Sequence, residues 1–179
     1  MRCGLEAAAI RSEPRDDAEQ LTQALRGDPL EVGERRAGWA RVTTAYGYPG
    51  WIRDEALCGD DAVSLARTFL GAPYEWGGLT AAGIDCSGLV HLAYRLTGQA
   101  VPRDAHEQEA AATQVDEATA RPGDLVCFGE PGRAHHIAFW LGDGRILHAT
   151  AREGVDAVVE EPLENVAARP IRFARLTMP

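Results

Sequence analysis

The chain has 179 residues, of which 45% are hydrophobic and 25% are charged, and its formal net charge is −9 at pH 7. This length suits one ordinary domain, or a small domain followed by a medium one, with enough apolar side chains to bury a core. The negative charge argues against nucleic acid as a partner, because phosphate binding needs a basic face.

No stretch of the sequence resembles a transmembrane span, so no membrane partner is expected, and residues 1–6 lack the apolar run of a secretion signal. The four cysteines show neither disulfide-like spacing nor a Cys-x-x-Cys pair, which is usual in a reducing compartment. These observations predict a cytoplasmic location. Nothing in the sequence specifies an oligomeric state, and a monomer is expected.

The first sixty residues contain several short β-prone runs separated by turn-forming residues. The runs lie at Val32, 39–42 and 50–52, and the turns at 27–29, 33 and 47–50. Short strands at this spacing predict a small all-β barrel. A boundary at Cys58 would give domains 1–58 and 59–179. A helix capped by Asp60 or Asp61 should follow, with Val63, Ala66, Phe69 and Leu70 on one side.

A second helix should begin at Cys86. Its apolar residues follow the three-and-four spacing of a helix with one buried face, at Leu89, Leu92, Ala93 and Leu96. Asp85 can cap the free amides at its start, and Gly98 can end it. The thiol of Cys86 then lies in the first turn, where the helix dipole favours the thiolate, which is the nucleophilic form.

Strands follow this helix, and helices before an antiparallel sheet are typical of an α+β fold. The β-prone runs are residues 123–128, 137–141, 145–150 and 171–176, with a hairpin turn at 142–144.

The hairpin carries His136 and His148, and its register decides whether they share a face. A two-residue turn at Asp143 and Gly144 would set Phe139 opposite His148 and turn His136 to the other face. A three-residue loop from Gly142 to Gly144 would set Ala138 opposite His148, so that the histidines become diagonal neighbours on one face. A catalytic pair requires the second register, and we expect the three-residue loop.

Six motifs in order then resemble the NlpC-type cell-wall peptidases, which are papain-like cysteine peptidases that cut peptidoglycan stem peptides. The motifs are residues 74–78, 83–90, 102–105, 121–125, 136–142 and 147–149. The resemblance extends from Asp61 to about Thr177, and the motif at 102–105 is most similar to the γ-D-glutamyl-L-diamino-acid endopeptidases, also called dipeptidyl peptidase VI. Residues 23–32, 38–42 and 47–52 resemble a bacterial SH3-like domain.

The chemistry needs three residues in stated roles. Cys86 would attack the scissile carbonyl, and His136 would hold the thiolate as an ion pair and later protonate the leaving amine. His148 would hydrogen-bond the far nitrogen of His136 and fix its ring. The backbone amide of Cys86 is a natural oxyanion donor, and Tyr74 lies where the family has a tyrosine that supports this hole. No metal or cofactor is needed.

The resemblance also implies the substrate, a stem peptide of the form L-Ala-γ-D-Glu-diamino acid with a free amino terminus. It places Asp104 where the family binds the ammonium group, and alignment with the SH3-like domain selects Glu19 and Tyr48 as further partners. The other expected substrate-binding residues are Asp85, Ser87, Trp76 and Arg103.

Other interpretations stay open. The same acyl-enzyme chemistry serves an endopeptidase of the intact wall, an amide hydrolase or an acyltransferase. A zinc hydrolase would use Cys86 and both histidines, but the ligand spacings typical of zinc sites are missing. A wall-binding module without activity would not need Cys86 and His136. The remaining cysteines, and His91, His106 and His135, are expected to be structural or solvated.

Overall fold

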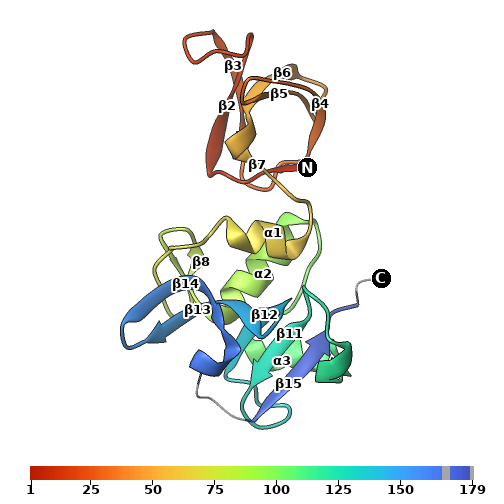
Figure 1. Ribbon diagram of the computed structural model, residues 1–179, viewed down its shortest axis with the longest axis vertical. Helices are drawn as coiled ribbons and strands as arrows, with labels where there is room; N and C mark the ends of the chain where they lie inside the picture. Colours follow the sequence, from red (N-terminus) through yellow and green to blue (C-terminus); the bar gives the residue numbers. More distant parts are fainter. Residues whose placement is uncertain (167–169, 178–179) are drawn as a thin grey trace. The chain divides into compact units, whose positions relative to one another are not determined.

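The computed structural model describes residues 1–166 and 170–177, and the chain forms two compact units, Met1–Thr68 and Phe69–Pro179 (Figure 1). The division falls after the first helix, α1 (Ala62–Arg67), whereas the sequence placed the domain boundary before it. Asp61 caps α1, because its side chain accepts a hydrogen bond from the Ser64 amide at 2.9 Å. The Arg26 guanidinium donates to the Thr68 carbonyl at 2.7 Å and so ties the end of this helix to the first unit.

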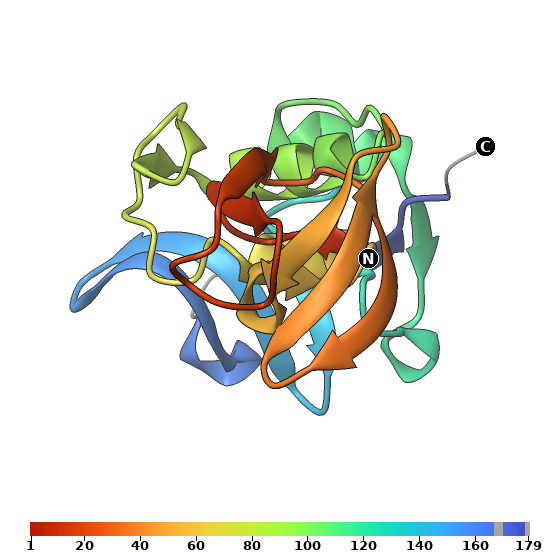
Figure 2. The same ribbon diagram turned by 90° about the horizontal axis from the view of Figure 1, so that it is seen from above.

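The first unit is built from short antiparallel strands, as the sequence predicted (Figure 2). Five of them form one sheet in the order β3-β2-β6-β5-β4, and β1 pairs with β7. The strands are β1 (Arg2–Cys3), β2 (Ala7–Arg11), β3 (Gln20–Leu25), β4 (Leu30–Arg36), β5 (Trp39–Thr44), β6 (Pro49–Arg53) and β7 (Leu57–Cys58), with a 3₁₀ turn η1 (Asp54–Ala56).

Small and β-branched side chains fill the interior of this unit, among them Ile10, Val42 and Ile52. Gly50 is needed where β6 passes β2, because a Cβ there would lie 2.3 Å from a methyl carbon of Ile10. Trp39 is buried, so it belongs to the packing of the domain, as the sequence indicated.

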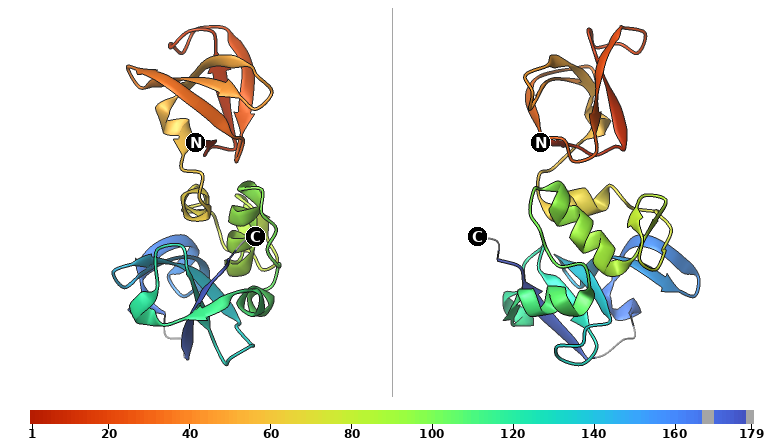
Figure 3. Two further views of the ribbon diagram at one scale, coloured as in Figure 1. Left: turned by 90° about the vertical axis from the view of Figure 1, so that its right-hand side faces the viewer. Right: turned by 180° about the vertical axis from the view of Figure 1, so that it is seen from behind.

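The second unit has a six-stranded antiparallel sheet in the order β10-β15-β11-β12-β13-β14, with helices beside it (Figure 3). Its strands are β10 (Thr113–Val115), β11 (Leu125–Phe128), β12 (His136–Gly142), β13 (Arg145–Arg152), β14 (Val155–Pro162) and β15 (Ile171–Arg175), and a small ribbon pairs β8 (Leu79–Thr80) with β9 (Gly83–Ile84). Short 3₁₀ turns are η2 (Glu117–Thr119) and η3 (Leu163–Asn165). Helix α3 (Ala105–Ala111) and strand β14 were not predicted from the sequence.

Helix α2 (Cys86–Leu96) begins and packs as its sequence predicted. The Asp85 side chain caps its first turn by accepting a hydrogen bond from the Gly88 amide at 2.6 Å. The apolar stripe of the helix packs on β12 and β13, where the rings of Tyr94 and Phe139 lie 6.1 Å apart between centroids. Within the part of the chain that the structure describes, no helix has both the length and the apolar character needed to cross a membrane.

The β12–β13 hairpin has the predicted register but not the predicted loop. Phe139 pairs with Leu147, and this register, continued by one residue, sets Ala138 opposite His148. The turn itself has two residues, Asp143 and Gly144, both with positive φ, which is the hairpin turn that matches strand twist. A β-bulge between Trp140 and Gly142 supplies the odd residue that we expected in the loop.

Candidate active site

Cys86 lies at the start of α2 on the wall of a cavity of about 460 Å³. The side chain is only 5% exposed, and the backbone N–H of Ile137, the residue after His136, faces its sulfur. The packing of α2 on β12 therefore brings the predicted nucleophile to the strand that carries the predicted base. Trp76, Ser87, Asp104, His106 and His135 also line the cavity.

The two predicted histidines are joined directly. The Nε2 atom of His136 lies 2.7 Å from the Nδ1 atom of His148, a hydrogen bond, and the rings meet edge to face with centroids 5.0 Å apart. His148 is fully buried, so the histidine behind His136 is held by the sheet and shielded from water. This geometry suits the orienting role predicted for it.

A third polar residue extends this series of hydrogen bonds, and it was not predicted from the sequence. The Nε2 atom of His148 lies 2.8 Å from Oε1 of Glu161 on β14. Glu161 also accepts hydrogen bonds from Arg152 and from Asn165, the latter at 2.9 Å. The β-prone valines at 155, 158 and 159 could have indicated a strand, but no local motif marks Glu161.

Burial shifts the pKa values of His136 and Cys86 toward their neutral forms. It lowers the pKa of His136 to about 3, helped by the neighbouring histidines His148 and His135. Burial likewise raises the pKa of the Cys86 thiol, and the Asp85 carboxylate adds to this, against the opposing hydrogen bond from the Ile137 amide. These directions favour a neutral thiol and a neutral imidazole. Burial of Cys86 thus opposes the thiolate that the helix start favours, and the expectation of a resting thiolate stays a prediction.

Alkylation of Cys86 by iodoacetamide is therefore expected to be slow at neutral pH. Its rate should still rise above about pH 8.5, the usual pKa of a free thiol, because only the thiolate reacts. Peptide mapping of the labelled protein measures the rate at Cys86 alone, with the Cys86→Ala variant as the blank. A rate that already levels off below neutral pH would show that a thiolate–imidazolium pair exists before substrate binds.

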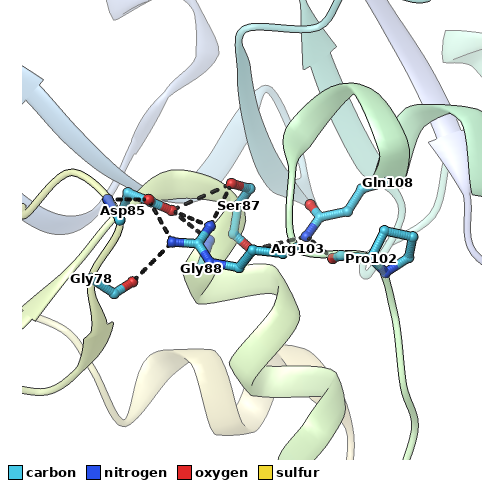
Figure 4. A network of polar contacts seen from close by, with 8 residues as sticks. Gly78, Asp85, Ser87, Gly88, Pro102, Arg103 and Gln108 are labelled. Carbon is cyan, nitrogen blue, oxygen red and sulfur yellow. Dashed lines mark hydrogen bonds and ion pairs between the residues drawn. The ribbon is translucent and has the colours of Figure 1, made fainter.

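The Asp85 carboxylate holds the start of α2 together (Figure 4). Arg103 donates to both carboxylate oxygens, at 2.9 and 2.7 Å, and the Gly77 amide donates at 2.7 Å. Burial alone would raise the pKa of Asp85, but these hydrogen bonds and that from the Gly88 amide outweigh it and lower the pKa. Asp85 is thus an ionised structural anchor, and its predicted contact with substrate stays a prediction.

Arg103 links this anchor to its surroundings. It also donates to the Ser87 hydroxyl at 3.0 Å and to the Gly78 carbonyl at 3.3 Å (Figure 4). Gly88 lets these groups approach, because a Cβ there would lie 2.5 Å from the Gly78 oxygen. The buried Gln108 of α3 donates to the carbonyls of Ser87 and Pro102, at 2.9 and 2.8 Å. The first turn of α2 is therefore fixed from several sides.

Three other predicted residues lie near the thiol. Trp76 is 84% exposed at the cavity and is free of the core. Asp104 stands at the N-cap position of α3, yet the described helix amides give its carboxylate no capping bond, and the residue lines the cavity. The backbone of Tyr74 bridges to Ile84, and burial, with the nearby Cys86, raises the pKa of the tyrosine.

Glu19 and Tyr48 belong to the first unit, where both are exposed. Their binding of the substrate ammonium stays a prediction. His91 bonds the Val101 carbonyl at 2.8 Å, whereas His106 and His135 line the cavity. Among residues 1–166 and 170–177, no three His, Cys, Asp or Glu side chains are grouped so as to hold a metal ion.

Both units of the chain are similar to known protein families. The NlpC/P60 family profile matches residues 71–170, and the profile of the bacterial dipeptidyl-peptidase SH3 domain matches residues 10–57. A solved NlpC/P60 family protein from Bacillus cereus superposes with a TM-score of 0.61 at 26% identity, covering 97% of this chain and 61% of that one. The fold is therefore the α+β peptidase fold of this family, preceded in the sequence by a small SH3-like domain.

Curated relatives include a γ-D-glutamyl-L-lysine dipeptidyl-peptidase from Bacillus cereus, 37% identical over 63% of this chain and 38% of its own length. The peptidoglycan endopeptidase RipB from Mycobacterium tuberculosis is 33% identical over 64% of this chain and 48% of its own length. The chain thus spans less than half the length of either relative.

Proposed function

The chain belongs to the NlpC/P60 family of peptidases, and we propose that it is a cysteine peptidase that cleaves free stem peptides of peptidoglycan. The bond cut is the γ-D-glutamyl bond to the diamino acid, in peptides with a free N-terminal L-Ala. The observation that carries the proposal is the placement of Cys86 beside a strand whose His136 is bonded to His148. The reaction would serve recycling of wall peptides in the cytoplasm.

The neutral resting pair sets the order of proton transfers. As the Cys86 sulfur attacks the carbonyl carbon, its proton passes to Nδ1 of His136, the ring nitrogen that His148 does not occupy. The Cys86 amide at the start of α2, with Tyr74, would bind the oxyanion. His136 then protonates the leaving amine of the diamino acid, and the C–N bond breaks. It next takes a proton from water, whose oxygen attacks the thioester. The C–S bond then breaks, the γ-glutamyl product leaves, and His136 returns the proton to the sulfur to restore the thiol.

The requirement for a free amino terminus rests on Asp104. Its carboxylate faces the cavity without a capping bond, so it is available for an ammonium group. Glu19 and Tyr48 of the first unit stay predicted substrate-binding residues. An exposed ion pair contributes about 1 kcal/mol or less, whereas breaking a pair buried in the complex costs on the order of 3–5 kcal/mol. The preference for a free over a blocked amino terminus therefore measures how far water is excluded from the occupied pocket.

Acetylation of the L-Ala amine is expected to lower kcat/KM for L-Ala-γ-D-Glu-diaminopimelate by about 10²–10³-fold, which corresponds to loss of a desolvated ion pair. The assay follows both peptides by mass spectrometry and identifies the scissile bond. Asp104→Asn should reduce the preference for the free amine, with exposed Glu107→Gln of the same helix as the matched control.

Two results would decide against this assignment. Comparable rates for the two peptides, or efficient cleavage of intact sacculi, would favour an endopeptidase of the wall, the activity named for the RipB relative. Transfer of the glutamyl group to an added amine in preference to water would instead identify an acyltransferase.

A further inference from the structure

The buried series of hydrogen bonds behind His136 does not end at His148. It runs from His136 to His148 at 2.7 Å, and from His148 to Glu161 at 2.8 Å. Glu161 is 6% exposed and His148 is fully buried, so water does not compete for these bonds. The position of each proton along the chain is therefore set by its partners within the protein.

Glu161, at the end of this series, can only accept hydrogen bonds. Burial would raise the pKa of Glu161, but the hydrogen bonds from Asn165, Arg152 and His148 outweigh this and lower it, so the group is ionised. An ionised carboxylate has no proton to donate. The bond at 2.8 Å must then be donated by Nε2–H of His148.

The donor role of Nε2–H in His148 fixes the tautomers of both imidazole rings. A neutral His148 that carries its proton on Nε2 has a lone pair on Nδ1, which accepts the bond at 2.7 Å. His136 must donate that bond from Nε2–H. Its Nδ1 atom is then left with a lone pair, and this is the nitrogen that can receive the thiol proton from Cys86.

We propose that Glu161 is a positioning residue that acts through His148 to hold His136 in the tautomer able to accept the Cys86 proton. The inference rests on the proposed cysteine peptidase function. It extends the site by a residue on β14, which the Arg152 and Asn165 side chains hold in place.

The change Glu161→Gln tests the proposal sharply, because the surroundings orient the new amide. Arg152 and Asn165 both donate to Oε2, and Arg152 reaches Oε1 only through a longer contact of 3.4 Å. The amide oxygen of the glutamine should take the Oε2 place, which leaves its NH₂ group facing His148. That group donates to Nε2, so the proton of His148 moves to Nδ1 and that of His136 also moves to Nδ1.

Long-range proton–nitrogen spectra of full-length protein with nitrogen-15 histidine report the tautomer of each ring. We expect Nε2–H on His136 and His148 in the parent protein and Nδ1–H on both in Glu161→Gln. Turnover should fall about 10³-fold in kcat with little change in KM, because the same kind of substitution in serine-peptidase triads costs about 10⁴-fold. Glu164→Gln, which removes an exposed carboxylate three residues away, should change neither readout.

A double variant checks the orientation step. Asn165→Asp in the Glu161→Gln background restores the lost charge. The new carboxylate can pair with Arg152, which otherwise donates at the Oε2 place, and can accept from the glutamine NH₂ group away from His148. The amide oxygen then faces His148, and we expect the parent tautomers to return with at least tenfold higher kcat than in Glu161→Gln. Circular dichroism and thermal unfolding confirm that each variant is folded.

Unchanged tautomers in folded Glu161→Gln would overturn the proposal, whatever happens to turnover. Switched tautomers with kcat within about threefold of the parent would overturn it as well, since the base would then not need its free Nδ1 atom. The spectra do not depend on the substrate, so a wrong substrate assignment would appear as lack of cleavage by the parent protein and would leave the tautomer result intact.

Discussion

Replacing Cys86 with alanine is expected to abolish cleavage of stem peptides, a loss of about 10⁶-fold in kcat. In the proposed reaction the sulfur forms the bond to the substrate carbonyl, and Cys86 is the only cysteine among the described residues that line the cavity. The thiol is a small side chain at the start of α2, so its removal should cost little stability. Mass spectrometry of the products, together with thermal unfolding, measures both effects.

Cys127→Ala is the matched control for this change. Cys127 is fully buried on β11, and burial raises the pKa of its thiol to about 12, so it is neither accessible nor nucleophilic. Its loss should lower stability without lowering kcat of the folded enzyme. Turnover above background in Cys86→Ala, or an equal loss in Cys127→Ala, would remove Cys86 from the role of nucleophile.

Loss of His136 should cost nearly as much as loss of the nucleophile. His136→Ala removes the acceptor for the thiol proton and the donor to the leaving amine, and members of such a triad act as a unit. Burial lowers the pKa of this imidazole to about 3, so the ring is unprotonated across the neutral range. The kcat of His136→Ala is therefore expected to fall about 10⁵–10⁶-fold.

The two variants of His148 separate orientation from packing. His148→Asn keeps an oxygen that can accept from Nε2–H of His136, and it should retain more activity than His148→Ala, which also leaves a cavity. His91→Ala is the control, because His91 bonds the Val101 carbonyl and belongs neither to the hydrogen-bonded series nor to the cavity lining. Equal losses in the two His148 variants, or a large loss in His91→Ala, would contradict the assignment.

Local patterns were enough to predict the helix that begins at Cys86. The periodic apolar residues of α2 and the capping Asp85 interact within a few residues of each other, so the sequence alone specifies them. The small β-domain was predicted on the same grounds, since turns and short strands are local features. The expected site residues Cys86, His136 and His148 came from the ordered motifs, and their neighbourhood in the second unit is as the motifs implied.

Features that depend on pairing between distant segments were decided by the tertiary structure. The bulge in β12 supplied the register for which a longer loop was expected, because a strand can absorb an odd residue at any point that its neighbours allow. Glu161 entered the site through the pairing of β14 with β13, which no motif reports. The raised pKa of the Cys86 thiol has the same origin: the helix start, which favours the thiolate, is visible in the sequence, but the burial that raises the pKa exists only once α2 is packed against β12.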